Sequence, residues 1–311
     1  MTAVDRSGVP VTSCPACHGT DLEQVGNGAS AFTSEIGGRQ FFQPAYAVHA
    51  CATCGLYCKS PILSPDQLDA YYAVLDGGTF EFDGDFPTDR ILRRRLQDLR
   101  RGSKVLDFGC STGRIWKGLT SRLQCFGVEP NAAAAAAARA RGIEIIAETT
   151  VAGSGQRYDA IVLADVFEHL SDPMPVLRML ADRLAPGGWL AIVTGNADAI
   201  THRQRLAEFW YFRIPGHLIM LGERHLAWLS RQLGLAIEVH HCSHYRIGWR
   251  DRVRQRVQEL AYDAFQTAPS GPAARVLRFV PRLSNAATWT AAPALTYRRD
   301  HVVALFSRRQ D

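Results

Sequence analysis

Two pairs of cysteines near the start of the chain have the spacing of metal ligands. Cys14 and Cys17 form one Cys-x-x-Cys pair, and Cys51 and Cys54 form the second. Four thiolates on two such turns provide the tetrahedral sulfur shell that Zn²⁺ prefers, and such a shell leaves no open position for catalysis. The spacing therefore predicts a structural zinc site, with four reduced core cysteines as the alternative.

A second chemical feature is the stretch 104–113, in which an apolar run ends in Asp107 and passes into a glycine-rich turn. The pattern predicts a strand, a tight turn and a helix over 114–123. Glycines let a ligand approach the backbone, and the free N–H groups at a helix start favour electron-rich atoms. Glu129 ends the next apolar run about 20 residues later, the spacing at which such folds bind a ribose hydroxyl. Together these residues predict a site for a nucleoside-type cofactor.

Strands and helices alternate from residue 103 onward. We expect strands at 103–109, 124–129, 143–147, 158–164, 189–194, 235–242 and 301–307, with helices at 131–141, 173–184 and 223–233. This alternation predicts an α/β fold with a doubly wound, seven-stranded Rossmann-like sheet covered on both faces. Ligands in such folds bind beyond the carboxyl ends of the strands.

The residues before the sheet predict smaller elements. Two strands at 32–36 and 40–49 flank a Gly-Gly turn. A helix begins at Pro65, with Ser64 as its cap, and a basic amphipathic helix covers 88–101. The segment between them, 77–87, is rich in Gly, Asp and Phe and is expected to form a loop.

The composition is that of an ordinary globular protein, with 47% hydrophobic and 21% charged residues. The net charge of +5 comes almost entirely from arginine and decides little about partners. No apolar run has the length of a membrane span, and the first ten residues lack a signal-peptide core. Eight cysteines in such a chain do not indicate a disulfide scaffold. We therefore expect a cytoplasmic protein.

Four segments, in order, resemble the motifs of class I S-adenosylmethionine-dependent methyltransferases. They are residues 105–113, 128–131, 158–170 and 185–190. Ser111 stands where the family commonly has glycine, which is a small departure because other small residues occur there. The Gly-x-Gly-x-x-Gly spacing of dinucleotide-binding folds is absent after the first strand.

The beginning of the chain is similar to a methyltransferase subgroup in which zinc knuckles and a Tyr-Tyr helix, here with Tyr71 and Tyr72, come first. That subgroup contains C-methyltransferases acting on nucleotide-linked deoxysugars, which usually carry a further C-terminal domain. The cluster of Asp165, Glu168 and His169 also resembles one in ubiquinone-pathway O-methyltransferases that is associated with a divalent cation.

The resemblance implies which residues bind S-adenosylmethionine. The cofactor-binding residues are expected to be Asp107, Gly109, Cys110, Gly113, Glu129, Pro130, Thr149, Ala164 and Asp165. Glu129 would meet the ribose, and Thr149 or Glu148 the adenine amino group. Asp107 would lie at the methionine end.

The resemblance also suggests candidates for proton transfer. The catalytic candidates are His169, Glu168, His217 and Tyr72, with Tyr71 as an alternative to Tyr72. His169 is the leading general base, and a structural or helix-capping histidine is the alternative. His217 belongs to the aromatic segment 209–218, which either lines the acceptor pocket or faces the core.

Three parts follow from these assignments. Residues 1–62 are predicted to form a zinc ribbon and 63–101 a helical lead-in that covers the cofactor and acceptor site. The methyltransferase domain would span 102–311, with an Arg-rich helical insertion at about 249–298. That insertion either packs on its own domain, mediates dimerisation, or contacts a membrane surface or an anionic partner.

We therefore predict methyl transfer from S-adenosylmethionine to a small-molecule acceptor, in an enzyme that carries structural Zn²⁺. A hydroxyl of a sugar or secondary metabolite is the favoured acceptor, and carbon of a nucleotide-linked sugar is the alternative. A non-enzymatic nucleic-acid-binding or regulatory protein with a zinc ribbon is the alternative of a different class. No nucleic-acid partner and no membrane span are expected, and the oligomeric state stays open.

Overall fold

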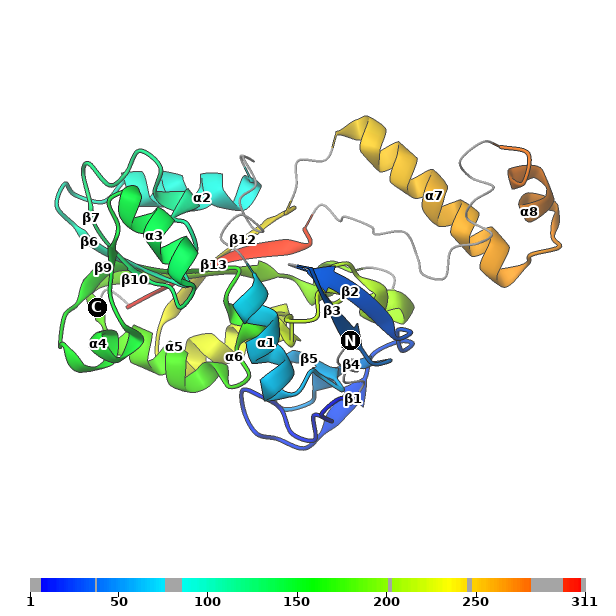
Figure 1. The fold of residues 1–311 in the computed structure, drawn as a ribbon, viewed down its shortest axis with the longest axis horizontal. Coiled ribbons are helices and arrows are strands. Elements are labelled where there is room, and N and C mark those ends of the chain that lie inside the picture. Colours follow the sequence, from blue (N-terminus) through cyan, green and yellow to red (C-terminus); the bar gives the residue numbers. More distant parts are fainter. Residues whose placement is uncertain are drawn as a thin grey trace.

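The computed structural model describes residues 7–36, 38–75, 86–200, 203–244, 248–280 and 299–308. A seven-stranded sheet forms the centre of the molecule, with helices α2 and α3 on one face and α4, α5 and α6 on the other (Figure 1). A small N-terminal sheet packs beside it, and helices α7 and α8 extend to one side (Figure 1).

The large sheet has the strand order β12-β13-β10-β9-β6-β7-β8. Its strands are β6 (Lys104–Phe108), β7 (Gln124–Val128), β8 (Glu144–Ile145), β9 (Tyr158–Ala164), β10 (Leu184–Gly195), β12 (Ala236–Cys242) and β13 (His301–Ser307). All pairs among β6 to β10 are parallel, whereas β13 runs antiparallel between β10 and β12. The predicted fold class and the seven predicted strands are confirmed.

Three helices after the sheet strands agree with the prediction: α3 (Ala132–Ala140), α5 (Pro173–Asp182) and α6 (Glu223–Leu233). Helix α4 (Glu148–Gly153) was not predicted. The helix expected over 114–123 is wrong, because only a 3-10 turn at Arg114–Trp116 forms there. Gly118 takes a φ of +80°, a left-handed conformation that an α-helix interior does not contain.

The N-terminal sheet joins distant parts of the chain. It has the order β1-β4-β5-β11, formed by β1 (Leu22–Gln24), β4 (Ala47–Cys51), β5 (Tyr57–Ser60) and β11 (Ile219–Met220). A separate hairpin consists of β2 (Phe32–Ile36) and β3 (Arg39–Gln43), so the single strand expected over 40–49 is two strands. Pro44 separates them, since proline has no N–H to continue a ladder. Because β11 completes this sheet, the sheet contains strands from both sides of the predicted domain boundary at residue 62. That boundary stays a prediction.

Two helices connect the sheets. Helix α1 (Pro65–Val74) begins as predicted at a capping box, in which the Ser64 Oγ accepts from the Gln67 N–H and the Gln67 side chain accepts from the Ser64 N–H. Helix α2 (Pro87–Gln97) buries Leu92 and Leu96 against the large sheet. Residues 76–85, most of the expected loop, lie outside the described residues.

The core lies on both faces of the central strands. Ile161 and Leu163 of β9 and Leu190 of β10 are 0% exposed on the face that packs against α5 and α6. Ala160 and Ala191 face the opposite cluster, which includes residues of α2. This two-sided burial explains the near-continuous apolar sequence of β9 and β10.

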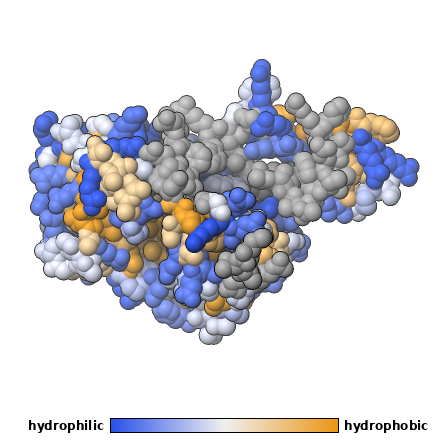
Figure 2. Space-filling model, in the orientation of Figure 1, coloured by the Kyte–Doolittle hydropathy of each residue, from blue (hydrophilic) through white to orange (hydrophobic). Residues whose placement is uncertain are grey.

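Helices α7 (Trp249–Thr267) and α8 (Pro272–Leu277) confirm the helical character of the predicted insertion, and residues 281–298 lie outside the described residues. Figure 2 shows hydrophobic residues among hydrophilic ones on this extension. Phe279 is 87% and Trp249 66% exposed. The Arg205 side chain pairs with Asp263 and so ties α7 to the body. No helix in the described part of the chain is both long enough and apolar enough to cross a membrane.

Shortening a buried side chain of a central strand should destabilise the fold far more than shortening an exposed side chain of the helical extension. We predict that Leu190→Ala lowers the free energy of unfolding by about 2–5 kcal/mol, because it removes a buried side chain and leaves a cavity. The matched change Leu260→Ala, at a side chain that is 52% exposed, should cost less than about 0.5 kcal/mol. Urea denaturation measures both, and equal losses would contradict this assignment of the core.

Candidate functional site

A cavity of about 1070 Å³ opens at the carboxyl ends of β6, β7 and β9. The turns that follow these strands form one wall. Residues of α1, among them Tyr72, and of the segment 209–218 form the other. The site therefore lies at the edge of the sheet where the sequence predicted it.

The turn after β6 brings the backbone close to its neighbours. Gly109 has a φ of +78°, and a Cβ there would lie 2.4 Å from Cγ2 of Val166. Ser111 has a φ of +46°, a conformation that glycine adopts without strain and serine does not. Gly113, with a φ of +79°, has no room for a side chain beside Ile143 and does not line the cavity.

Glu129 is held in place through both carboxylate oxygens. Its Oε2 accepts from the backbone N–H of Ser111 at 2.8 Å, and its Oε1 accepts from the N–H of Asn131 at 2.8 Å. Asn131 caps α3 and donates through Nδ2 to the carbonyl of Leu75, at the end of α1. The side chain of Glu129 is thus fixed at the cavity wall by the turns of two strands.

Asp107 ends β6 with a buried carboxyl. Its Oδ2 accepts from Nε1 of Trp116 at 2.6 Å, and its Oδ1 has no hydrogen-bond partner among the described residues. Burial raises the pKa of Asp107 to about 7. An unpaired buried oxygen that lines a cavity is suited to a ligand's donor group.

The remaining predicted cofactor residues divide by position. Cys110, Pro130, Ala164 and Asp165 line the cavity. Thr149 is exposed on α4 and does not line it, whereas Glu148, the alternative for the adenine contact, does.

Glu168 lies at the centre of a buried hydrogen-bond network. Its carboxylate accepts from Oγ1 of Thr194 at 2.7 Å and from the hydroxyl of Tyr211. Its backbone carbonyl accepts from the N–H of Leu218 at 2.8 Å. Burial raises the pKa of Glu168 to about 8, and the nearby Asp165 acts in the same direction.

His169 lies beside this network with a defined tautomer. Its Nδ1 is 3.0 Å from the carbonyl oxygen of Gly216 and 2.9 Å from the hydroxyl of Tyr72. A carbonyl only accepts, so Nδ1 carries the proton and Nε2 keeps its lone pair. Burial lowers the pKa of His169 to about 4 and raises that of Tyr72, so the imidazole and the phenol are both neutral at pH 7.

The aromatic segment 209–218 both lines the cavity and contributes to the core, the two alternatives that the sequence left open. Trp210, Tyr211 and His217 line the cavity, whereas Phe209 and Phe212 are buried in the core. The His217 ring lies 4.7 Å from the His169 ring, and its Nε2 is 3.9 Å from Oε1 of Glu168. Three of the four catalytic candidates therefore meet within this cluster, and Tyr72 joins it from α1.

Several cavity residues were missed from the sequence. Phe86 precedes α2, and Arg114 stacks on its ring at 4.5 Å while binding Asp89. His244 follows β12 and also lines the cavity, and His301, at the start of β13, packs against its ring. The sequence held one clue for His301. The last strand was expected to run antiparallel, and the first residue of such a strand lies at the carboxyl ends of the parallel strands, beside the cavity.

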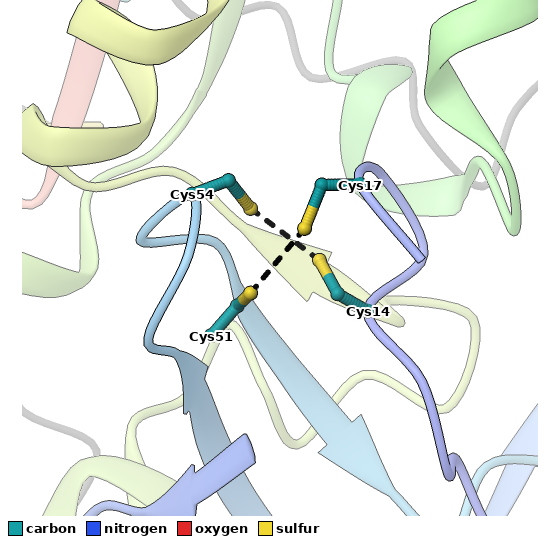
Figure 3. A group of neighbouring side chains, drawn as sticks. All are labelled: Cys14, Cys17, Cys51 and Cys54. Carbon is teal, nitrogen blue, oxygen red and sulfur yellow. Dashed lines mark hydrogen bonds between the residues drawn. The ribbon is translucent and has the colours of Figure 1, made fainter. Parts of the chain in front are cut away.

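The four N-terminal cysteines converge on one point, as Figure 3 shows. The sulfur of Cys14 is 3.4 Å from that of Cys54, and the sulfur of Cys17 is 3.5 Å from that of Cys51. Four sulfurs at about 2.3 Å from one tetrahedral ion are about 3.8 Å apart, close to this spacing. The donation from Cys54 lowers the pKa of Cys14 to about 5. The knuckles pack against α6, where the His225 ring contacts the carbonyl of Cys54 at 3.2 Å.

Comparison with known protein families gives one match, which extends across about half of the chain. A family model described as a methyltransferase domain matches residues 84–240, about half of the 311 residues. The matched region contains the strands β6 to β10 and most of the cavity wall.

Curated relatives share the same region. The ubiquinone biosynthesis O-methyltransferase of Parvibaculum lavamentivorans is 30% identical over 155 residues, which cover 47% of this chain and 54% of that protein. The probable tRNA methyltransferase 9B of Mus musculus is 29% identical over 163 residues, 50% of this chain and 34% of that protein. The chain thus matches about a third to two thirds of the length of such relatives. Among solved structures, the YcgJ protein of Bacillus subtilis has a TM-score of 0.47 at 14% identity, covering 72% of this chain and 99% of that one.

The tautomer and neutrality of His169 predict how its ring titrates. Because burial lowers its pKa to about 4, the His169 resonance should not shift between pH 8 and about pH 5.5, and should begin to shift only below. Proton NMR of the histidine rings measures this, with His169→Asn to assign the signal. In the denatured chain the same ring should titrate near 6.5. A folded-state midpoint near 6.5 would contradict the buried, neutral imidazole.

Proposed function

Because this chain belongs to the methyltransferase-domain family, we propose that it transfers a methyl group from S-adenosylmethionine to a hydroxyl group of a small molecule, a sugar or secondary metabolite. The observation that carries the proposal is the neutral His169, which faces the cavity beside the cofactor wall with Nε2 unprotonated. A hydroxyl acceptor must lose a proton to become a nucleophile, and such an imidazole can take it.

The residues of the cofactor wall fit S-adenosylmethionine. The unpaired Oδ1 of Asp107 suits the donors of the methionine end, and the backbone at Gly109 leaves space for close approach. Glu129 would hold the ribose hydroxyls, and Glu148 would meet the adenine. When bound, the cofactor supplies a methyl group on a positively charged sulfur.

The cavity has room for a second molecule beside the cofactor. Its volume of about 1070 Å³ is at the upper end of the range of about 300–1,000 Å³ for ligand pockets. Trp210, which is only partly buried, offers a flat apolar surface on the acceptor side, where a sugar or another ring could stack.

In this proposal the protein's main contribution is positioning. Holding two reactants in line contributes about 7–11 kcal/mol for well-oriented groups, and a general base adds about 10²–10⁴-fold. His169 would take the hydroxyl proton at Nε2. Tyr72 and the Gly216 carbonyl hold the ring through Nδ1 and so keep Nε2 as the acceptor atom. Tyr72 is a positioning residue in this scheme, because burial raises its pKa.

Two other acceptors follow from specific observations. Carbon of a nucleotide-linked sugar would need the same base, and the cysteine knuckles and Tyr-Tyr helix support it. RNA is suggested by the name of the mouse relative and by the exposed arginines 252, 254 and 256 on α7. Salt-dependent RNA binding would favour that acceptor class.

Methyl transfer and cofactor binding should respond differently to the substitutions Glu129→Ala and His169→Ala. With methyl-labelled S-adenosylmethionine and a cell extract, the wild-type chain should label a small molecule. Glu129→Ala should weaken cofactor binding at least tenfold, because it removes the carboxylate proposed to hold the ribose. His169→Ala should keep cofactor affinity, measured by calorimetry, and lower turnover by about 10²–10⁴-fold.

The matched control is His240→Ala, a partly exposed histidine of β12 paired with Glu238 away from the cavity, which should leave both quantities unchanged. Unchanged affinity in Glu129→Ala would refute its ribose role. Undiminished turnover in His169→Ala would move the base role to His217. Label in RNA instead of a small molecule would replace the acceptor class.

We also propose that the four cysteines hold structural Zn²⁺. Their convergence within 4.8 Å and the complete set of four protein ligands support a closed site that stabilises the N-terminal sheet.

Thiol chemistry should release this zinc. We expect a thiol-modifying reagent to liberate about one zinc per chain, followed with a colorimetric zinc indicator, because the ion is bound through sulfur. The variant Cys14→Ser/Cys54→Ser should release none, whereas Cys125→Ser, at a buried cysteine of β7, should release the wild-type amount. Untagged wild-type protein without zinc would contradict the assignment.

A further inference from the structure

A second group of metal-ligating side chains lies at the cavity edge, apart from the cysteines. It consists of Asp165, His244 and His301, whose ligand atoms all lie within 4.8 Å of one another. Asp165 follows β9, His244 follows β12, and His301 begins β13. Because β13 runs antiparallel to both β10 and β12, its first residue and the ends of β9 and β12 meet at one edge of the sheet.

His301 has the hydrogen-bond arrangement of a metal ligand. Its ring is fully buried, and Nδ1 lies 3.1 Å from Oδ1 of Asp300, which is also fully buried. Nδ1 donates to this carboxylate, so Nε2 carries the lone pair. Among the described residues Nε2 has no hydrogen-bond partner. Metal-binding histidines typically donate their second ring nitrogen to a carboxylate in this way.

His244 is held next to His301 in a form that can bind a metal. Its backbone N–H donates to the same Oδ1 of Asp300 at 2.9 Å, and the two rings are 4.4 Å apart. Both rings therefore lie within reach of one ion, to which a neutral imidazole can offer a lone pair.

Asp165 supplies the carboxylate. Its φ of +56° is uncommon for a residue other than glycine and directs the chain sharply after β9. The side chain is 32% exposed and lines the cavity, 3.9 Å from the guanidinium of Arg114. The Tyr211 hydroxyl also lies 3.4 Å from Oδ1 of Asp165, a longer contact than its bond to Glu168. Glu168 is 0% exposed and accepts from both Thr194 and Tyr211, so the more exposed Asp165 has more capacity for a cation.

We propose that Asp165, His244 and His301 bind a divalent transition-metal ion, such as Zn²⁺ or Fe²⁺, with open coordination positions toward the cavity. Two imidazoles and one carboxylate suit such ions, and three protein ligands leave room for an external oxygen. Ligand atoms that share one ion at about 2.1 Å are at most about 4.2 Å apart, so small side-chain rotations complete the site.

The external ligand would be an oxygen of the acceptor. This assignment rests on the proposed function, but the metal site itself does not depend on that function. A bound ion would supply positive charge that makes the acceptor hydroxyl more acidic and would hold it in one orientation, while His169 would still take its proton, as in the proposed function. The ion thereby selects acceptors with a metal-binding oxygen, such as diols and enols.

The test uses the full chain, loaded with zinc and then dialysed against a weak chelator until one zinc per chain remains at the cysteines, so that the proposed site is empty. Co²⁺ is then titrated in, followed by calorimetry and visible absorption. We expect one further equivalent of Co²⁺ to bind, without the intense charge-transfer absorption that thiolate ligands produce. His244→Ala and His301→Asn should each weaken this binding at least tenfold. Asp300→Asn should weaken it about 10–100-fold, because it removes the partner that orients His301.

His240→Ala is the matched control and should bind Co²⁺ as the wild type does. Absence of the extra equivalent, or wild-type affinity in His244→Ala, would overturn the site. His301 is buried, so His244→Ala decides the question if His301→Asn fails to fold.

S-adenosylhomocysteine binding in the same samples separates this proposal from the proposed function. Cofactor binding and methyl transfer without the extra Co²⁺ would overturn the metal site alone. Co²⁺ binding without methyl transfer would support the metal site and refute the proposed function.

Discussion

The buried carboxyl of Glu168 is the constraint on which the cavity wall formed by the segment 209–218 depends. Burying such a group costs several kcal/mol unless hydrogen bonds compensate, and the hydroxyls of Thr194 and Tyr211 provide them. Thr194 comes from β10 and Tyr211 from the segment 209–218, so this segment must close over the strand ends. The bond from the Leu218 N–H to the Glu168 carbonyl fixes it there. As a result His217 comes to lie beside the ring of His169.

The same segment is held from outside by the N-terminal sheet. Lys59 of β5 is fully buried, and its Nζ donates to the carbonyl of Ile214 at 3.0 Å while its backbone N–H donates to the carbonyl of Leu218 at 2.8 Å. Burial lowers the pKa of Lys59 to about 7. Strand β4 of this sheet ends at Cys51, one of the four clustered cysteines. The cysteine cluster and the segment 209–218 are therefore parts of one packed unit, although about 160 residues separate them in sequence.

Most of the fold was predictable because it follows from short-range patterns. The apolar runs of β6, β9 and β10 and the cap at Ser64 lie where the sequence indicated. The helix after β6 was wrong, because its apolar spacing ignored the left-handed turn at Gly118. The strand expected over 40–49 was wrong because Pro44 interrupts it. In both cases the backbone conformation at one residue, a left-handed glycine or a proline without an N–H, outweighed the hydrophobic pattern.

By itself the sequence determined the turns after β6 and β7 and the two Cys-x-x-Cys pairs. Each turn or pair consists of residues a few positions apart, whose geometry the local backbone dictates. Only the tertiary structure decided how distant parts of the chain meet: which residues of the segment 209–218 line the cavity and which are buried, that Glu148 lines it whereas Thr149 does not, and that His244 and His301 meet Asp165. The physical reason is strand order. An antiparallel β13 inserted between β10 and β12 brings residues about 60 and 140 positions apart to one edge, and this pairing depends on packing of the whole sheet.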